Sequence, residues 1–205
     1  MSDRGVLTVI SGFSGAGKGT VVKQLLQKYD YGLSISATTR SPREGEQDGR
    51  EYFFKTKEEF EKMIRENQLI EYAQYVGNYY GTPKEYVVQQ LEQGKDVILE
   101  IEMQGALHVR EILPEVNLIF LTPPTVDELE RRLVSRGTET AEVIRERMAR
   151  AKEESAYMKE YDYIVINDDL DECVENVHQL IRSLHYKREQ QEGFIQKIKQ
   201  EFEKR

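Results

Sequence analysis

The sequence predicts an α/β fold in which helices cover both faces of a parallel sheet. Four short apolar segments rich in β-branched residues, 6–10, 97–101, 118–121 and 163–166, are the strand candidates. Each is followed by a stretch whose apolar residues have helical spacing. Strands that alternate with helices predict a parallel sheet, because a crossover helix returns the chain to the end of the sheet at which the previous strand began.

Composition sets the class of protein. The 205 residues are 39% hydrophobic and 32% charged, which is typical of one globular domain with a sizeable core. The longest apolar runs, 6–10 and 116–121, fall far short of the ~20 residues that cross a bilayer, and the N-terminus lacks a signal-peptide pattern. We therefore expect a cytoplasmic protein without a membrane partner, and a monomer or a homodimer.

Charge and cysteine content exclude two further classes. The formal net charge of -8 argues against a nucleic-acid partner, because binding to a phosphate backbone normally requires a basic surface. Arginines instead cluster locally, around 40–50 and 131–150, where guanidinium groups can bind individual phosphates. Cys173 is the only cysteine, so no internal disulfide can form, and packing is its expected role.

The first strand candidate ends at a glycine-rich loop that opens a helix at 21–26. The loop consists of Gly12, Phe13, Ser14, Gly15, Ala16, Gly17, Lys18, Gly19 and Thr20. Its glycines and lysine have the spacing that lets main-chain N–H groups surround phosphates. The helix N-terminus adds partial positive charge, which makes a chance glycine-rich turn a poor alternative. We expect this loop to bind a nucleotide and the sheet to be of the P-loop NTPase type.

The loop departs from the usual pattern after its lysine. A serine or threonine that ligates magnesium normally follows, whereas this chain has Gly19 and then Thr20. We expect Thr20 to contact a phosphate and Mg²⁺ to be held through water or by other groups.

The segment 34–88 breaks the alternation of strands and helices. It is rich in tyrosine, glycine and arginine and contains short alternating pieces at 51–54 and 72–76. We interpret it as an inserted antiparallel subdomain.

Several motifs, in order along nearly the whole chain, resemble those of guanylate kinases. They are SATTRSPR at 36–43, GE at 45–46, GREYFF at 49–54, EYA at 71–73, GNYYGT at 77–82, LEIEMQG at 99–105, RGTE at 136–139 and VINDD at 165–169. The resemblance implies an enzyme of purine nucleotide metabolism that uses Mg-ATP to phosphorylate GMP and also dGMP.

By this resemblance the insertion binds GMP. Arg40, Arg43, Tyr52 and Tyr80 would hold the GMP phosphate, and two guanidinium forks with two phenol hydroxyls suit a dianion. The guanine would be faced by Ser36, Glu71, Thr82 and Glu102. A carboxylate can accept hydrogen bonds from the ring N–H and the amino group of guanine. The alternatives are a solvated loop for the arginines, sheet packing for the tyrosines and surface charge for each glutamate.

Glu100 and Glu102 lie two apart on the strand candidate at 97–101. Both side chains should therefore leave the same face at the carboxyl end of the sheet, where open α/β sheets bind ligands. The family more often has aspartates at these places, which leaves open which glutamate serves the metal. We assign Glu100 to the magnesium environment.

The family also implies arginines over the ATP phosphates, at Arg136 and Arg147, and contacts to adenine from Asn167 and Asp168. Capping of the next helix explains 167–169 equally well. Solvated helix charge is the simple interpretation of Arg131, Arg132, Arg145 and Arg150.

Transfer between phosphates requires alignment and positive charge rather than a general base, because the acceptor phosphate is already largely ionised. The catalytic set is therefore Lys18, Arg40, Arg43, Arg136 and Arg147. His108, His178 and His185 are assigned no catalytic role.

We expect one domain over 1–205. Its core comprises 1–33, 89–130 and 151–205, with the GMP-binding insertion at 34–88 and a lid at 131–150. After 171 the chain is expected to be helical, and an apolar stripe at Phe194, Ile195, Ile198 and Phe202 predicts that the last helix packs on its own domain. A subunit contact is the alternative for that stripe.

Two rival functions remain. Guanylate-kinase-like domains also occur as non-catalytic protein-interaction modules, and other P-loop kinases act on other phosphorylated acceptors. The intact Lys18, Arg40 and Arg43 argue against the first. The combination of Ser36, Glu71 and Thr82 argues against the second.

Overall fold

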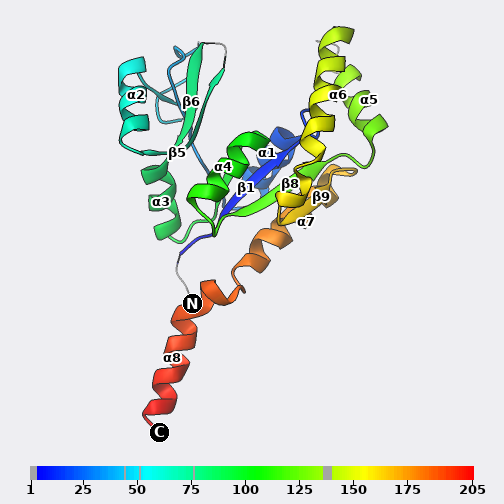
Figure 1. The fold of residues 1–205 in the computed structure, drawn as a ribbon. Coiled ribbons are helices and arrows are strands. Elements are labelled where there is room, and N and C mark those ends of the chain that lie inside the picture. The colour runs from blue at the N-terminus through cyan, green and yellow to red at the C-terminus, as the bar shows by residue number, and fades with distance from the viewer. Residues whose placement is uncertain (1–3, 44, 51, 76, 136–139) are drawn as a thin grey trace.

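The central sheet has the parallel α/β arrangement that the sequence predicts. The computed structural model describes residues 4–43, 45–50, 52–75, 77–135 and 140–205. Five strands lie in the order β2-β7-β1-β8-β9, and every pairing is parallel (Figure 1). Their bounds are β1 Leu7–Gly12, β2 Gly32–Leu33, β7 Val97–Glu100, β8 Asn117–Thr122 and β9 Tyr163–Ile166.

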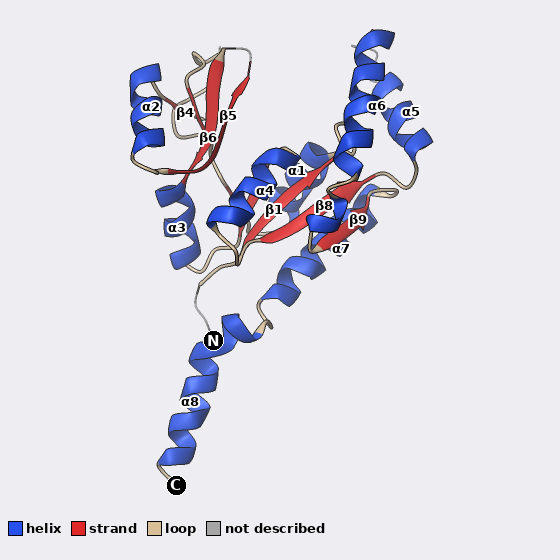
Figure 2. Cartoon of the chain, in the orientation of Figure 1, coloured by secondary structure: helices blue, strands red, loops and turns tan. Residues whose placement is uncertain are grey.

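Helices cover both faces of this sheet, as Figure 2 shows. Helices α1 (Lys18–Lys28) and α7 (Leu170–Leu184) bury one face, whereas α3 (Lys84–Glu92) and α4 (Met103–Ile112) bury the other. Alternation along the strands divides the core, because Val9 packs toward α4 and Ile10 toward α1. Cys173 of α7 lies within the second cluster, and burial raises the pKa of its thiol to about 11. Packing is therefore its role in the fold.

The insertion forms a second, smaller sheet in the order β4-β3-β6-β5. Its elements are β3 Ala37–Thr38, β4 Phe53–Phe54, α2 Lys57–Arg65, β5 Leu69–Tyr75 and β6 Asn78–Pro83. The pairs β3–β6 and β5–β6 are antiparallel as expected, but β3 and β4 run parallel. The sheet is thus mixed, since the chain between β3 and β4 returns to the end of the sheet where β3 began. Phe60 of α2 closes a small separate core.

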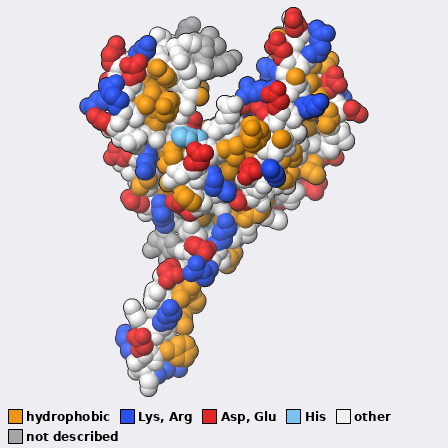
Figure 3. Space-filling view, in the orientation of Figure 1, with side chains coloured by type: hydrophobic (Ala, Val, Ile, Leu, Met, Phe, Trp, Pro, Cys, Tyr) orange, Lys and Arg blue, Asp and Glu red, His pale blue; other side chains and the backbone are white. Residues whose placement is uncertain are grey.

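Two helices project beyond the carboxyl ends of the central strands, on the side of the molecule opposite the second sheet. They are α5 (Val126–Ser135) and α6 (Ala141–Ser155), which contact each other. A short 3-10 turn at Met158–Glu160 leads into β9. The predicted Arg136 lies outside the described residues. Between these helices and the second sheet the surface is hollowed (Figure 3).

The last helix contradicts the prediction that it packs on its own domain. Helix α8 (Glu192–Glu203) extends away from the body, and none of its residues is buried. Phe194 and Phe202 are 49% and 71% exposed. The 3-10 turn at Arg188–Gln191 redirects the chain, and the Gln191 side chain holds that turn by donating to the His185 carbonyl at 2.7 Å. None of the described helices has the length and apolar character that crossing a bilayer requires.

Candidate functional site

The glycine-rich loop between β1 and α1 needs glycine for steric reasons. Gly12, Gly15 and Gly17 have φ values of 149°, 98° and 91°, a region that side chains disfavour. A Cβ at Gly12 would lie 2.0 Å from the Leu121 carbonyl oxygen, and one at Gly17 would lie 2.6 Å from Asn167 Nδ2. The loop is therefore pressed against β8 and the end of β9, and its shape depends on residues without side chains.

Lys18 begins α1 and is nearly buried. Its Nζ donates to the carbonyls of Gly12, at 2.8 Å, and Phe13, at 3.3 Å, and lies 3.9 Å from Glu102 Oε1. Phe13 packs edge-on against Phe120, with ring centroids 4.9 Å apart. This aromatic contact anchors the loop to the core.

A cavity of about 560 Å³ opens over the loop, within the usual size range of small-ligand sites. It brings most of the predicted phosphate loop together with both predicted glutamates. Glu100 is the last residue of β7, but Glu102 lies beyond the strand, at the N-cap position of α4, rather than on it as predicted. Its lining consists of Phe13, Ser14, Gly15, Gly17, Lys18, Gly19, Thr20, Lys23, Glu100 and Glu102.

Glu100 lies beside the start of α1. A Cβ at Gly19 would be 3.4 Å from Glu100 Oε1, so the missing side chain at 19 leaves room for this carboxylate. Partial burial is the main reason that the pKa of Glu100 is raised. The positive charge of Lys18 opposes this shift, and the negative charge of Glu102 adds to it. Among the described residues no group of three or more acidic, histidine or cysteine side chains could hold a metal. The Glu100 carboxylate beside the phosphate loop fits Mg²⁺, which typically takes one or two carboxylates together with phosphate oxygens and water.

A buried polar pair lies where the second sheet meets α4. Thr82 Oγ1 donates to Glu71 Oε1 at 2.7 Å, and the two residues are 1% and 9% exposed. Glu71 Oε2 faces the first turn of α4, 3.5 Å from where a Cβ of Gly105 would lie. Burial raises the Glu71 pKa. Since Glu102 occupies the N-cap position of α4 and lines the cavity over the loop, the first turn of α4 lies next to both Glu71 and this cavity.

Arg40 is held in place at the second sheet. Its guanidinium donates to both oxygens of Glu46, at 2.9 and 3.0 Å, and lies 5.3 Å from the Tyr52 ring centroid. The rings of Tyr52 and Tyr80 are 6.1 Å apart. The Arg43 main-chain N–H donates to Glu46 Oε2 at 2.7 Å.

Glu46 was assigned no role from the sequence, yet it joins both predicted phosphate-binding arginines. The hydrogen bond from Arg40 is the main reason that its pKa is lowered. The signal was present in the GE motif at 45–46, which begins two residues after Arg43. Ser36 is half-buried, and its carbonyl accepts from the Phe53 N–H at 2.9 Å.

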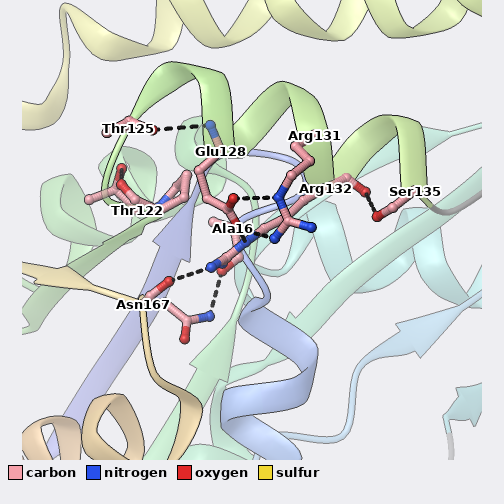
Figure 4. A network of polar contacts seen from close by, with 9 residues as sticks. Ala16, Thr122, Thr125, Glu128, Arg131, Arg132, Ser135 and Asn167 are labelled. Carbon is pink, nitrogen blue, oxygen red and sulfur yellow. Dashed lines mark hydrogen bonds and ion pairs between the residues drawn. The ribbon is translucent and has the colours of Figure 1, made fainter.

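Helices α5 and α6 bring arginines to the loop. Arg147 NH1 donates to Ser14 Oγ at 2.6 Å. Arg132, interpreted from sequence as a solvated charge, donates to Glu128 at 2.6 Å and to the Asn167 carbonyl at 2.8 Å (Figure 4). Asn167 is 5% exposed, and its side chain donates to the Ala16 carbonyl at 2.8 Å.

Asp168 and Asp169 have other surroundings. Both line a separate cavity of about 710 Å³ between β9 and α7. Asp169 caps α7 by accepting from the Glu172 N–H at 2.9 Å, which is the local alternative that the sequence left open.

Comparison with known proteins gives consistent matches. The family model described as guanylate kinase matches residues 4–184. A guanylate kinase from Streptococcus agalactiae is 55% identical over 191 residues, covering 91% of this chain and 90% of the relative. One from Oceanobacillus iheyensis is 54% identical over 190 residues, covering 92% of each. The crystal structure of guanylate kinase from Anaplasma phagocytophilum superposes with a TM-score of 0.67 at 31% identity, covering 88% of this chain and 86% of that one.

Proposed function

The chain belongs to the guanylate kinase family, and we propose that it transfers the terminal phosphoryl group of ATP to GMP, releasing ADP and GDP. One observation supports the proposal beyond the family match. The buried Glu71 carboxylate faces the first turn of α4, and Glu102 at the start of the same helix lines the cavity over the loop, which supports one site for base and phosphates.

The donor half is the loop with its cavity. We propose that the loop N–H groups and Lys18 bind the ATP phosphates, with Thr20 contacting a phosphate. Lys18 donates to its own loop carbonyls at 2.8 and 3.3 Å, so binding ATP would exchange these bonds for bonds to phosphate oxygens. Arg147, beside Ser14, would add positive charge to the group in transfer, and Arg136 would do the same. Asn167 and Asp168 would lie toward the adenine.

The acceptor half reads base and phosphate separately. Glu71 and Glu102 would accept the guanine N–H groups, with Ser36 and Thr82 as hydroxyl partners. A site of this kind rejects a base that lacks those donors by roughly 10⁴-fold, because its buried polar groups would lose their partners. Arg40, Arg43, Tyr52 and Tyr80 would hold the GMP phosphate in line with ATP.

The reaction joins an acceptor phosphate oxygen to the γ-phosphorus of ATP as the bond to the β-bridging oxygen breaks. Because the acceptor oxygen is already ionised, no proton has to be removed. The rate depends instead on the alignment of the two substrates and on positive charge around the group in transfer. Glu100 would hold Mg²⁺, directly or through water, and the metal would supply positive charge to the phosphates.

The rival functions have less support. An interaction module would not need Lys18, Arg40 and Arg147 directed at a cavity or a phosphate subsite. A kinase for another acceptor would not need the buried Glu71–Thr82 pair. We also propose a cytoplasmic monomer or homodimer in purine nucleotide metabolism, where both substrates occur.

A coupled ADP-release assay with Mg-ATP tests the function. The acceptors are GMP, dGMP, AMP, CMP, UMP and IMP, and the variants are Lys18→Ala and Glu71→Gln. We expect turnover with GMP that is lost in Lys18→Ala, and a weakened preference for guanine in Glu71→Gln. Measurable GMP binding without turnover of any acceptor would favour the interaction module instead.

A further inference from the structure

Helix α6 presents two arginines one turn apart, and each reaches a different half of the site. Arg147 NH1 donates to Ser14 Oγ of the phosphate loop at 2.6 Å. Arg150 NH2 lies 3.9 Å from Glu102 Oε2. Residues at i and i+3 share a helix face, so one rigid element contacts both the loop and the carboxylate proposed to read the guanine.

Glu102 lies between two cations from different elements. Its Oε1 is 3.9 Å from Lys18 Nζ, and its Oε2 is 3.9 Å from Arg150 NH2. Both separations are too long for hydrogen bonds, and the side chain is 61% exposed. The carboxylate is therefore oriented by charge on both sides while its lone pairs stay available to N–H groups of a ligand.

The Arg150 guanidinium is itself oriented by a residue one turn further along α6. Its Nε donates at 2.9 Å to Glu154, whose side chain is only 7% exposed. A buried carboxylate needs a charged or hydrogen-bonded partner, so the Glu154 contact orients the guanidinium. The sequence-based interpretation of Arg150 as a solvated charge is therefore incomplete.

We propose that Arg150 is a positioning residue that couples the acceptor site to the donor site through Glu102. The inference rests on the proposed function. Guanine N–H groups that bind Glu102 would hold its carboxylate toward Arg150. The Glu102–Arg150 ion pair would in turn keep α6 in the position in which Arg147 faces the ATP phosphates. Because coupling between two sites is reciprocal, ATP would in turn raise the affinity for GMP.

A double-mutant cycle between Arg150→Met and Glu102→Gln tests the coupling. Steady-state rates give KM for GMP, KM for ATP and kcat, while calorimetry gives GMP affinity with and without a non-hydrolysable ATP analogue. We expect Arg150→Met to raise KM for GMP about fivefold, as for a partly exposed ion pair, and to reduce the gain in GMP affinity that the analogue produces. In the Glu102→Gln background the same substitution should change KM for GMP less than about twofold, because coupled residues are not additive.

The matched control is Arg145→Met, an exposed arginine of the same helix, which should match the wild type. Arg150→Lys keeps the charge without the guanidinium fork and should recover part of the loss, which separates positioning from folding. Two outcomes would overturn the inference. Arg150→Met could have equal effects in both backgrounds, or it could leave KM for GMP and the coupling at their wild-type values. In either case GMP turnover by the wild type would still uphold the proposed function. Absence of GMP turnover in the wild type would overturn both.

Discussion

The Asn167 side-chain nitrogen donates to the Ala16 carbonyl oxygen at 2.8 Å and so ties the end of β9 to the middle of the phosphate loop. Asn167 is 5% exposed, and its own carbonyl accepts from Arg132 at 2.8 Å. The same amide nitrogen occupies the space where a side chain at Gly17 would lie. Loop, strand end and α5 thus share one small network (Figure 4).

Asn167→Ala should loosen the loop. The Ala16 carbonyl would lose a buried partner, so the free energy of unfolding should fall by about 1–2 kcal/mol. KM for ATP should rise more than KM for GMP, because the loop belongs to the donor half. Chemical denaturation and steady-state kinetics measure both, with the exposed Asn176→Ala of α7 as control. A larger effect on KM for GMP would contradict the assignment.

Gly17→Ala should damage the same network from the other side. A positive φ costs about 1–3 kcal/mol for a residue with a side chain, and the added Cβ would displace Asn167. We expect a lower melting temperature and loss of ATP binding by calorimetry. Gly193→Ala in α8 is the matched control, because nothing lies within 4 Å of the added Cβ. Its melting temperature should equal or slightly exceed that of the wild type.

Glu46→Gln should weaken GMP binding selectively. The neutral amide would no longer form the paired charge-assisted hydrogen bonds that hold Arg40 beside Tyr52. We expect KM for GMP to rise about tenfold with KM for ATP unchanged, whereas Glu58→Gln on the exposed face of α2 should behave as the wild type. Equal increases in both KM values would show that Glu46 supports the whole fold rather than the acceptor phosphate site.

Strand positions and the phosphate loop could be predicted because they depend on local pattern. Apolar runs with β-branched residues marked β1, β7, β8 and β9, and glycine spacing marked the loop between β1 and α1. The parallel β3–β4 pair could not be predicted, since strands of two residues carry almost no periodicity.

Side-chain partners were harder to predict than elements. Arg132 and Arg150 have the sequence pattern of exposed helix charges, and only tertiary packing brings them to Asn167 and Glu102. Glu46 likewise acquires its role from the folding of the loop around Arg40. The apolar stripe of α8 showed which face is hydrophobic but not whether the body covers it.

Removal of 192–205 should leave the catalytic domain intact. No residue of α8 is buried, so its loss removes little packing. We expect the melting temperature to change by less than about 2 °C, because exposed residues contribute little to stability. Light scattering after gel filtration then decides between monomer and homodimer, and a drop in mass on truncation would assign the stripe to a subunit contact. A large loss of stability in a chain of unchanged mass would contradict the exposed position of α8.

Glu71→Gln should alter how stability depends on pH. Burial raises the Glu71 pKa above its ordinary value of 4.5, so the folded chain holds this proton more tightly than the unfolded chain does. Glu71 therefore favours folding most at pH values below its ordinary range, and this contribution is lost as pH rises through the folded pKa. Glutamine does not ionise and can still accept the Thr82 hydrogen bond.

The free energy of unfolding of Glu71→Gln, relative to the wild type, should therefore increase as pH rises above the ordinary carboxyl range. Chemical denaturation from pH 4 to pH 8 measures this difference, with Glu58→Gln expected to follow the wild type throughout. Glu71→Gln should also lose preference for GMP over AMP, because the neutral amide is a weaker acceptor for the guanine N–H groups. A difference that stays constant with pH would mean that Glu71 titrates alike in the folded and unfolded chains, and would remove burial as the source of its selectivity.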